Sequence, residues 1–487
     1  MFEDTLQYVL DLGKNNEYLD IRLETFQNVV IRSINNEISK AFTYQKKGVG
    51  IRILTDGAWG FACTPKIDDK DQLKKTVLIA RKMAQTESTR TKKPIRLTEI
   101  PVSKAKVEVE CKQDFREISL EEKIQMVLEW TQEIAISDAL VRSIADYASI
   151  SANKYFWSSE GTKIQFIRPI VNVNLGGVAK GTSGVRTYYQ PWGGTFNNVG
   201  GTGGHEILGN DGDLTEICNI VGEKAINLAN AKPAPTLRNV PIVFDPSYMA
   251  LLVHEIIGHP SEADRVLGWE AAWAGSTWWK GMSADEGNPT QIGSKYVTVY
   301  NDPTVLGNFA YMLYDDEGTP CKKTTLVKEG VLTERMHSRE TAYEMGVEPN
   351  GAMRANTYEY HPIIRPINVF WGTGDWKAEE IIEDTKDGVY LLGANIPSID
   401  DQRYNWAISS LEGYLIKNGE LADHLHSCAA TATTPIFLES IDALASDDQQ
   451  LFWSGCGKGD PMQGGTVGNG GPTMRGIATL VGPGSGK

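Results

Sequence analysis

Residues 249–260 read Met249-Ala250-Leu251-Leu252-Val253-His254-Glu255-Ile256-Ile257-Gly258-His259-Pro260. This run predicts a buried helix over 247–258, preceded by a short buried strand over 240–244. A histidine followed by a glutamate inside a buried helix is costly unless both side chains have partners. We therefore expect this helix to lie at the centre of a domain and to carry a candidate metal site.

The two histidines of this stretch stand five residues apart, one more than in the common zinc peptidase pattern. On an ideal helix, five residues leave the two side chains roughly 140° apart, too far to share one ion. Gly258 and Pro260 both disfavour helix, so the helix should end or distort at Gly258 and let His259 turn back toward His254. The same residues also fit a simple helix end with His259 incidental, so the spacing alone leaves metal ligation open.

The remaining histidines are weaker candidates for metal ligands. His205 precedes a glutamate, but no second histidine follows it and glycines surround it. His424 and His426 alternate as in a strand, which would suit a metal only if a third ligand converged on them. His337 and His361 are isolated, and we interpret them as structural histidines.

The pattern of elements predicts an α+β fold in three domains, with boundaries at 1–95, 105–232 and 237–480. In the first, a helix ending near Gly13 precedes strands over 18–24, 28–34, 39–45 and 48–54 and a helix over 70–85. In the second, a helix capped at Ser119 precedes further strands and a closing helix over 214–231. A proline-containing boundary over 232–236 leads to a mostly β C-terminal domain that carries the metal-binding helix.

Composition narrows the class of protein. The chain has 487 residues, enough for two or three domains, and a net charge of −14, which argues against a nucleic acid partner. No apolar run reaches the ~20 residues of a membrane span, and acidic residues near the N-terminus argue against a signal peptide. Six scattered cysteines match neither a disulfide framework nor a short zinc motif. We expect a cytoplasmic protein without a membrane partner.

Motifs along almost the whole chain resemble those of the TldD/PmbA family of metallopeptidases. The 254–259 hexad is similar to that of TldD-type subunits, which keep the metal-binding residues. The segments over 17–23 and 48–61 resemble the family's opening strands. Further motifs fit in order in the last domain, over 316–320, 328–332, 354–358, 412–419 and 454–459.

The resemblance implies that Cys456, in the sequence Gly455-Cys456-Gly457-Lys458, is the third metal ligand beside His254 and His259. Its two neighbouring glycines would let the backbone approach an ion closely. Two imidazoles and a thiolate leave a fourth position open, as a catalytic zinc site requires. Zinc is the first choice and iron(II) is possible. The implied activity is hydrolysis of short or unfolded peptides, with Glu255 as the general base that takes a proton from water.

The resemblance also implies a dimer, formed either with a second copy or with a TldE/PmbA-like subunit that lacks the metal motif. Arg354, Asn356 and Thr357 would hold the substrate backbone or, equally, fix a turn. Two other functions stay open from the residues alone. One is another metal hydrolase, such as an amidase or a deformylase-like enzyme. The other is a non-catalytic metal-binding or partner subunit of a TldD/TldE-like complex.

Overall fold

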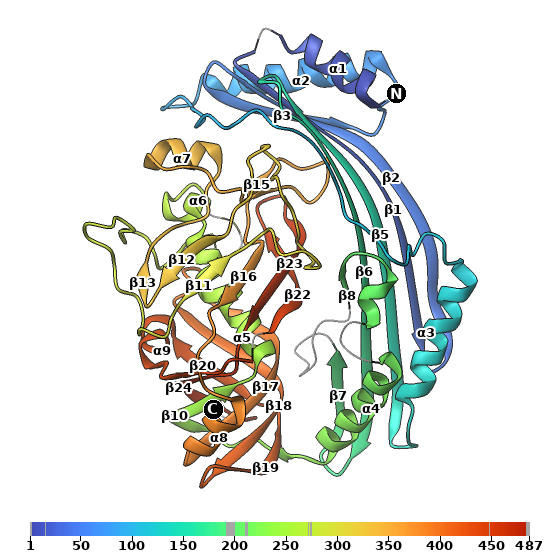
Figure 1. Cartoon of the computed structure of the whole chain (residues 1–487), viewed down its shortest axis with the longest axis vertical. Helices are drawn as coiled ribbons and strands as arrows, with labels where there is room; N and C mark the ends of the chain where they lie inside the picture. The colour runs from blue at the N-terminus through green and yellow to red at the C-terminus, as the bar shows by residue number, and fades with distance from the viewer. Residues whose placement is uncertain are drawn as a thin grey trace.

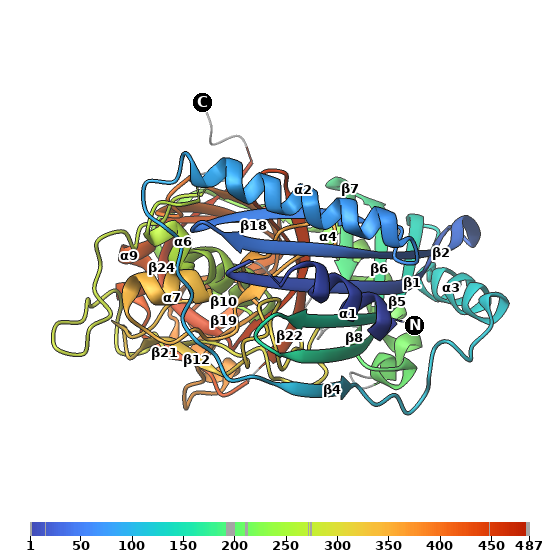
Figure 2. The same cartoon turned by 90° about the horizontal axis from the view of Figure 1, so that it is seen from above.

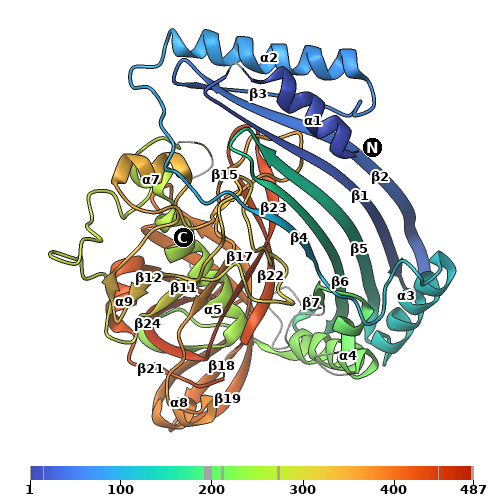
Figure 3. The ribbon, with the colours of Figure 1, turned by 45° about the horizontal axis from the view of Figure 1, so that its top comes forward.

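The computed structural model describes residues 2–14, 16–190, 200–209, 213–270, 272, 275–447 and 449–483. A long curved sheet arches along one side of a C-terminal domain, which lies on its concave side (Figures 1 and 3). Helices and strands are mixed in both parts, and the α+β, multi-domain architecture predicted from the sequence is confirmed. No helix in the described part of the chain is long and apolar enough to cross a membrane.

The curved sheet is built from long strands in the order β3-β2-β1-β5-β6-β4. Its strands are β1 (Tyr18–Ile34), β2 (Glu37–Thr55), β3 (Ala58–Thr64), β4 (Lys104–Glu108), β5 (Leu140–Ser158) and β6 (Lys163–Gly181), while β7 (Gly184–Gln190) and β8 (Gly200–Thr202) also pair with β6. The sequence predicts two short strands within each of β1 and β2. Each is instead one strand, because β1–β2 pairing continues across the expected breaks with a register shift only at Arg32/Ser33. Since β1 also pairs with β5, segments far apart in the sequence share this sheet.

Four helices cover the two ends of the curved sheet (Figure 3). α1 (Phe2–Leu12) and α2 (Lys70–Ser88) lie at one end, and α3 (Leu120–Ile134) and α4 (Leu214–Asn230) lie at the other. Ser119 caps α3 in a capping box with Glu122, as the sequence predicts. After α2 the chain passes α7 (Arg339–Met345) of the C-terminal domain before it reaches β4 (Figure 2), and Thr98 N–H donates to the Arg339 carbonyl at 3.1 Å.

Two sheets form the C-terminal domain. In the first, the order β17-β10-β24-β20-β18 closes on itself, because β18 also pairs with β17. Its strands are β10 (Leu237–Phe244), β17 (Asp387–Ile399), β18 (Asn405–Lys417), β20 (Ala429–Thr433) and β24 (Met474–Val481), extended by β9 (Lys232–Pro233), β19 (Glu420–His426) and β21 (Ala443–Leu444). The second has the order β13 (Val331–Leu332), β12 (Thr324–Lys328), β11 (Val299–Asn301), β16 (Asn368–Trp371), β23 (Gln463–Gly471) and β22 (Gln449–Lys458).

Shorter elements complete the C-terminal domain. α6 (Ala263–Val266), α8 (Ala378–Asp384) and α9 (Thr434–Ser440) lie around the two sheets, and β14 (Met353–Arg354) pairs with β15 (Ile363–Ile364). The β14–β15 pair lies on the side of the domain that approaches the curved sheet (Figure 1).

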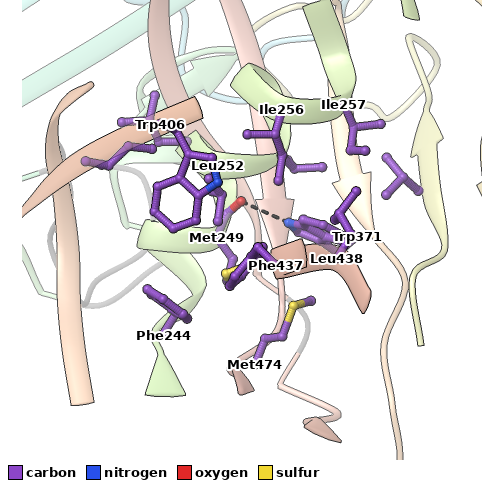
Figure 4. Close-up of a cluster of buried hydrophobic side chains, with 14 of the residues drawn as sticks. Phe244, Met249, Leu252, Ile256, Ile257, Trp371, Trp406, Phe437, Leu438 and Met474 are labelled. Carbon is purple, nitrogen blue, oxygen red and sulfur yellow. Dashed lines mark hydrogen bonds between the residues drawn. The ribbon is translucent and has the colours of Figure 1, made fainter. Parts of the chain in front are cut away.

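Helix α5 (Pro246–Val253) lies in the core between these two sheets. Asp245 caps it by accepting the Tyr248 N–H at 2.7 Å, and Pro246 occupies its first turn. Figure 4 shows Met249 and Leu252 among aromatic side chains of the core, with the Trp371 indole N–H donating to the Met249 carbonyl at 3.0 Å. Every side chain from Ser247 to Val253 is buried. A helix enclosed on all sides cannot shift easily, so it fixes the position of the residues that follow it.

Candidate metal centre

The chain widens into a π-helical turn, η2 (His254–Gly258), directly after α5. Its defining hydrogen bond runs from the His259 N–H to the His254 carbonyl, five residues back. Residues five apart therefore lie on one face of the turn, and the two imidazole ring centres are 4.6 Å apart. The distortion spans the whole turn from His254 to Gly258, whereas the glycine and proline predict it at Gly258.

Cys456 reaches the two histidines from a distant part of the sequence. It lies on β22, which forms a hairpin with β23, and both strands contact α5. The Cys456 Sγ atom is 3.1 Å from Nε2 of His259, which lies 197 positions earlier in the chain. The potential ligand atoms of His254, His259 and Cys456 all lie within 4.8 Å of one another, and all three side chains are buried.

The second ring nitrogen of each histidine has its own partner. His254 Nδ1 is 3.2 Å from the Asn469 amide oxygen, and His259 Nδ1 is 3.1 Å from a Glu262 carboxylate oxygen. Both oxygens accept, so each Nδ1 carries the proton and each Nε2 is left with a lone pair for a cation. Glu262 follows His259 by three residues, a spacing that could have flagged it, whereas no local signal marks Asn469.

The charges around the cluster favour a thiolate. Burial opposes ionisation of Cys456, but His259, Arg365 and His254 outweigh it and hold the pKa of the thiol well below its ordinary value. Burial also opposes charge on His254, yet the neighbouring Cys456 raises the pKa of that imidazole. Burial, followed by the nearby Arg403, lowers the pKa of His259 well below its ordinary value.

This set of donors fits a zinc ion. Zinc binds thiolate sulfur at about 2.3 Å and imidazole nitrogen at about 2.0 Å, which places tetrahedral ligand atoms roughly 3.5 Å apart. The three donor atoms lie close enough for this geometry after small side-chain movements. Three protein donors leave one tetrahedral position for a water or a substrate atom.

Glu255 lies beside the cluster and is not among the three grouped donors. Its carboxylate forms an ion pair with the Arg403 guanidinium, and the two side chains are 15% and 7% exposed. Arg403 lies between β17 and β18 with a positive φ of 61°. Nothing near Arg403 in the sequence predicts a role at Glu255, because the two residues are far apart in the chain.

The other histidines have partners away from this cluster. His205 contacts the Tyr147 hydroxyl, His337 contacts Thr341, and the His361 ring contacts the carbonyl of the next residue. His424 contacts the Glu412 carboxylate at 2.9 Å, and His426 contacts an arginine. Within the described part of the chain, none of them joins a group that could hold a metal. Arg354, Asn356 and Thr357 line a cavity between the curved sheet and the C-terminal domain.

Three family models match this chain. The PmbA/TldA metallopeptidase domain 1 matches residues 19–84, the central domain of the same family matches 113–232, and its C-terminal domain matches 237–478.

Individual relatives agree with these matches. A metalloprotease from Methanothermobacter thermautotrophicus is 32% identical over 475 residues, 97% of each chain. A zinc metalloprotease TldD homolog from Saccharolobus solfataricus is 27% identical over 268 residues, 54% of this chain and 56% of that protein. The crystal structure of TldE from Thermococcus kodakarensis shares the fold, with a TM-score of 0.76 over 99% of each chain at 17% identity.

Proposed function

Because the chain belongs to the PmbA/TldD metallopeptidase family, we propose that it is a metal-dependent peptidase that hydrolyses short or unfolded peptides. The observation that carries this proposal is the convergence of His254, His259 and Cys456 beside Glu255. A structural zinc site usually has four protein ligands, so three donors with an adjacent carboxylate favour catalysis.

In the proposed reaction His254, His259 and Cys456 would hold a zinc ion, which would act as a Lewis acid toward the scissile carbonyl and toward water. Glu255 accepts a proton from the attacking water and returns it to the leaving amine. Arg403 positions the Glu255 carboxylate through its ion pair. Asn469 and Glu262 hold the two imidazole rings in the orientation that ligation needs.

Burial of the site supports a flexible peptide as the substrate. The three proposed ligands are at most 5% exposed, so a peptide bond in a rigid folded protein could not approach them. Zinc is our first choice of metal, in line with the name of the Saccharolobus relative, and iron(II) suits the same donors. The proposal includes a dimer, formed with a second copy or with a subunit similar to TldE, whose fold this chain shares.

Two substitutions test the metal ligands and the base together. Glu255→Gln should keep about one metal ion per chain and stop cutting an unstructured peptide pool, because it removes only the base. Cys456→Ala should lose both metal and activity, since two imidazoles alone bind zinc weakly. Cys428→Ala is the matched control, because Cys428 is buried in the same domain and is not one of the grouped donors.

Two outcomes would overturn parts of this proposal. Full metal content and activity in Cys456→Ala would place the third ligand elsewhere. A wild-type protein that holds metal but cuts no peptide, even with a TldE-like subunit added, would favour the non-catalytic metal-binding subunit.

A further inference from the structure

A cavity of about 400 Å³ lies between the curved sheet and the C-terminal domain. One wall comes from the middle of β1 and β2, the last part of β5 and the first part of β6. The other comes from residues near 312–316, 354–357 and 464–466. This volume is in the range of pockets that bind small ligands. The proposed mechanism uses none of its side chains.

Three arginines line this cavity, and none of them forms an ion pair with a carboxylate among the described residues. The Arg354 side chain lines the cavity, and its guanidinium forms no hydrogen bond or ion pair with any residue that the structure describes. Arg365 is 3% exposed and donates only to the carbonyls of Cys456 and Gln463, at 2.6 and 3.1 Å, while its Nε has no partner among the described residues. The Arg168 guanidinium makes one long hydrogen bond within the described part of the chain, 3.4 Å to the Tyr311 carbonyl.

The acidic groups of the cavity are already engaged. Lys154 lies 2.7 Å from an Asp316 oxygen and 3.3 Å from a Glu24 oxygen. Burial, followed by Glu317, raises the pKa of Asp315, and its carboxylate oxygens accept the backbone N–H groups of Glu317, Thr319 and Met353. Burial, followed by the neighbouring Arg168 and Arg365, lowers the pKa of Arg354 to about 9. The three guanidinium groups therefore lie near one another with no ion pair to a carboxylate among the described residues. The anionic groups that favour the charged form of Arg354, Asp316 and the Cys456 thiol, act on it without forming such a pair.

The cavity also adjoins the candidate metal centre. Gly465 lines the cavity and lies directly opposite Cys456 in the β22–β23 hairpin, so side chains at these positions point to the same face. A Cβ atom at Gly465 would lie 3.4 Å from the Arg365 guanidinium. Arg365 therefore lies on the face of the hairpin toward which the Cys456 thiol points.

We propose that this cavity binds a carboxylate of the substrate peptide, with Arg354, Arg365 and Arg168 as its binding groups. Guanidinium groups match carboxylates in geometry and bind them through paired N–H donors. The remaining walls are largely apolar and would accept an apolar side chain next to the carboxylate; they include Phe26, Phe156, Ile164, Phe166, Ile170 and Met312. The inference rests on the proposed function and adds a substrate class to it.

Peptide binding tests this site without relying on turnover. The zinc-loaded Glu255→Gln protein would be titrated with three labelled peptides of one apolar sequence: a free C-terminal acid, its C-terminal amide, and the amide with an internal glutamate. The free acid should bind at least about tenfold more tightly than the plain amide, the usual effect of a charged hydrogen bond. Arg354→Gln should remove this ratio, and Arg354→Lys should restore part of it.

A matched control uses Lys46, which lines the same cavity but forms an ion pair with Glu359. Lys46→Gln should leave the acid-to-amide ratio unchanged. If Arg354→Gln fails to fold, as judged by its urea unfolding midpoint, Arg168→Gln provides the same test. Tighter binding of the glutamate peptide than of the plain amide would support the site and show that acidic side chains also enter it.

Equal affinities for acid and amide in the parent protein would overturn the proposal. So would a ratio that survives in both folded arginine variants. Because the assay measures binding by a protein without its proposed base, a negative result here is separate from a failure of the wild type to cut peptides.

Discussion

At the scale of single residues, histidines of the same domain differ in what surrounds their rings. His254 and His259 each have one nitrogen hydrogen-bonded and the other beside a thiolate. His337 is equally buried, but the one hydrogen bond of its ring among the described residues is to the Thr341 hydroxyl. Burial, followed by Arg335, lowers the pKa of this imidazole to about 3. In the folded protein His337 therefore stays neutral at pH values at which it would be protonated in the unfolded chain.

We predict that His337 makes the protein acid-sensitive. An unfolded histidine has a pKa near 6.5, so between pH 6.5 and about 3 the unfolded chain binds a proton that the folded chain does not. The contribution of neutral His337 to the free energy of unfolding is complete above pH 6.5. It falls as the pH drops, by about 2 kcal/mol at pH 5. The free energy of unfolding in urea should differ less between pH 8 and pH 5 for His337→Gln than for the wild type.

Packing lost in this variant lowers the stability equally at pH 8 and at pH 5. The difference in stability between the two pH values therefore reports only the effect of protonation. Equal losses of stability in wild type and His337→Gln between pH 8 and pH 5 would contradict the prediction.

At the scale of elements, the turn after α5 decides the geometry of the site. Gly258 and His259 both keep right-handed helical dihedral angles, although Pro260 follows them. Side chains from outside the turn take up carbonyls of this segment: the Trp278 indole donates to Ile256 at 3.1 Å, and the Thr277 hydroxyl donates to Pro260 at 2.9 Å. The packing around the turn, more than the glycine, therefore supports the five-residue turn.

We predict that Gly258→Ala is tolerated. The added Cβ would lie 3.4 Å from a Val369 methyl and 3.6 Å from Pro366, ordinary contact distances, and no positive φ is involved. The free energy of unfolding in urea should change by less than about 1 kcal/mol, since alanine is more stable in a helix than glycine by a similar amount. The metal content per chain should be unchanged.

Gly60→Ala is the contrasting control. Its Cβ would lie 1.9 Å from the Ala80 carbonyl of α2, so this variant should be less stable than the wild type by roughly 1–3 kcal/mol. A folded Gly258→Ala protein that no longer holds metal would show that the glycine itself is needed for the turn.

At the scale of the whole molecule, a buried ion-pair network joins the curved sheet to the C-terminal domain. The Arg52 guanidinium on β2 lies 2.6 Å from Asp20 on β1 and 3.0 Å from Glu317 of the C-terminal domain. All three side chains are at most 1% exposed. The cavity lies between the same two parts, so this contact helps to hold its walls together.

We predict that Arg52→Met loses about 3–5 kcal/mol of stability, because it leaves two carboxylates buried without their shared partner. Calorimetry and urea unfolding would measure the loss. Arg475→Met is the control: its partners Asp384 and Asp442 are about half exposed, so it should lose less than about 1 kcal/mol. Similar small losses in both variants would show that the Arg52 network is not important for joining the two parts.

The sequence by itself was enough to predict the features that depend on neighbours in the chain. The apolar run before His254 predicts a buried helix, and Ser119 with Glu122 predicts a capped helix start; both are present. The ordered motifs also identified the family, which the family models confirm. These features could be predicted because the spacing of apolar residues, the helix cap and the motifs can each be read from neighbouring residues along the chain.

Only the tertiary structure decided how distant segments meet. Pairing of β1 with β5 and packing of the β22–β23 hairpin on α5 join residues more than a hundred positions apart, and loop closure at such lengths leaves no local pattern. The π-helical turn, the contacts of Asn469 and Arg403 and the arginine-lined cavity all depend on that packing. The chain therefore encodes its candidate ligands locally, while their geometry comes from long-range contacts, because only a completed core fixes side chains in one arrangement.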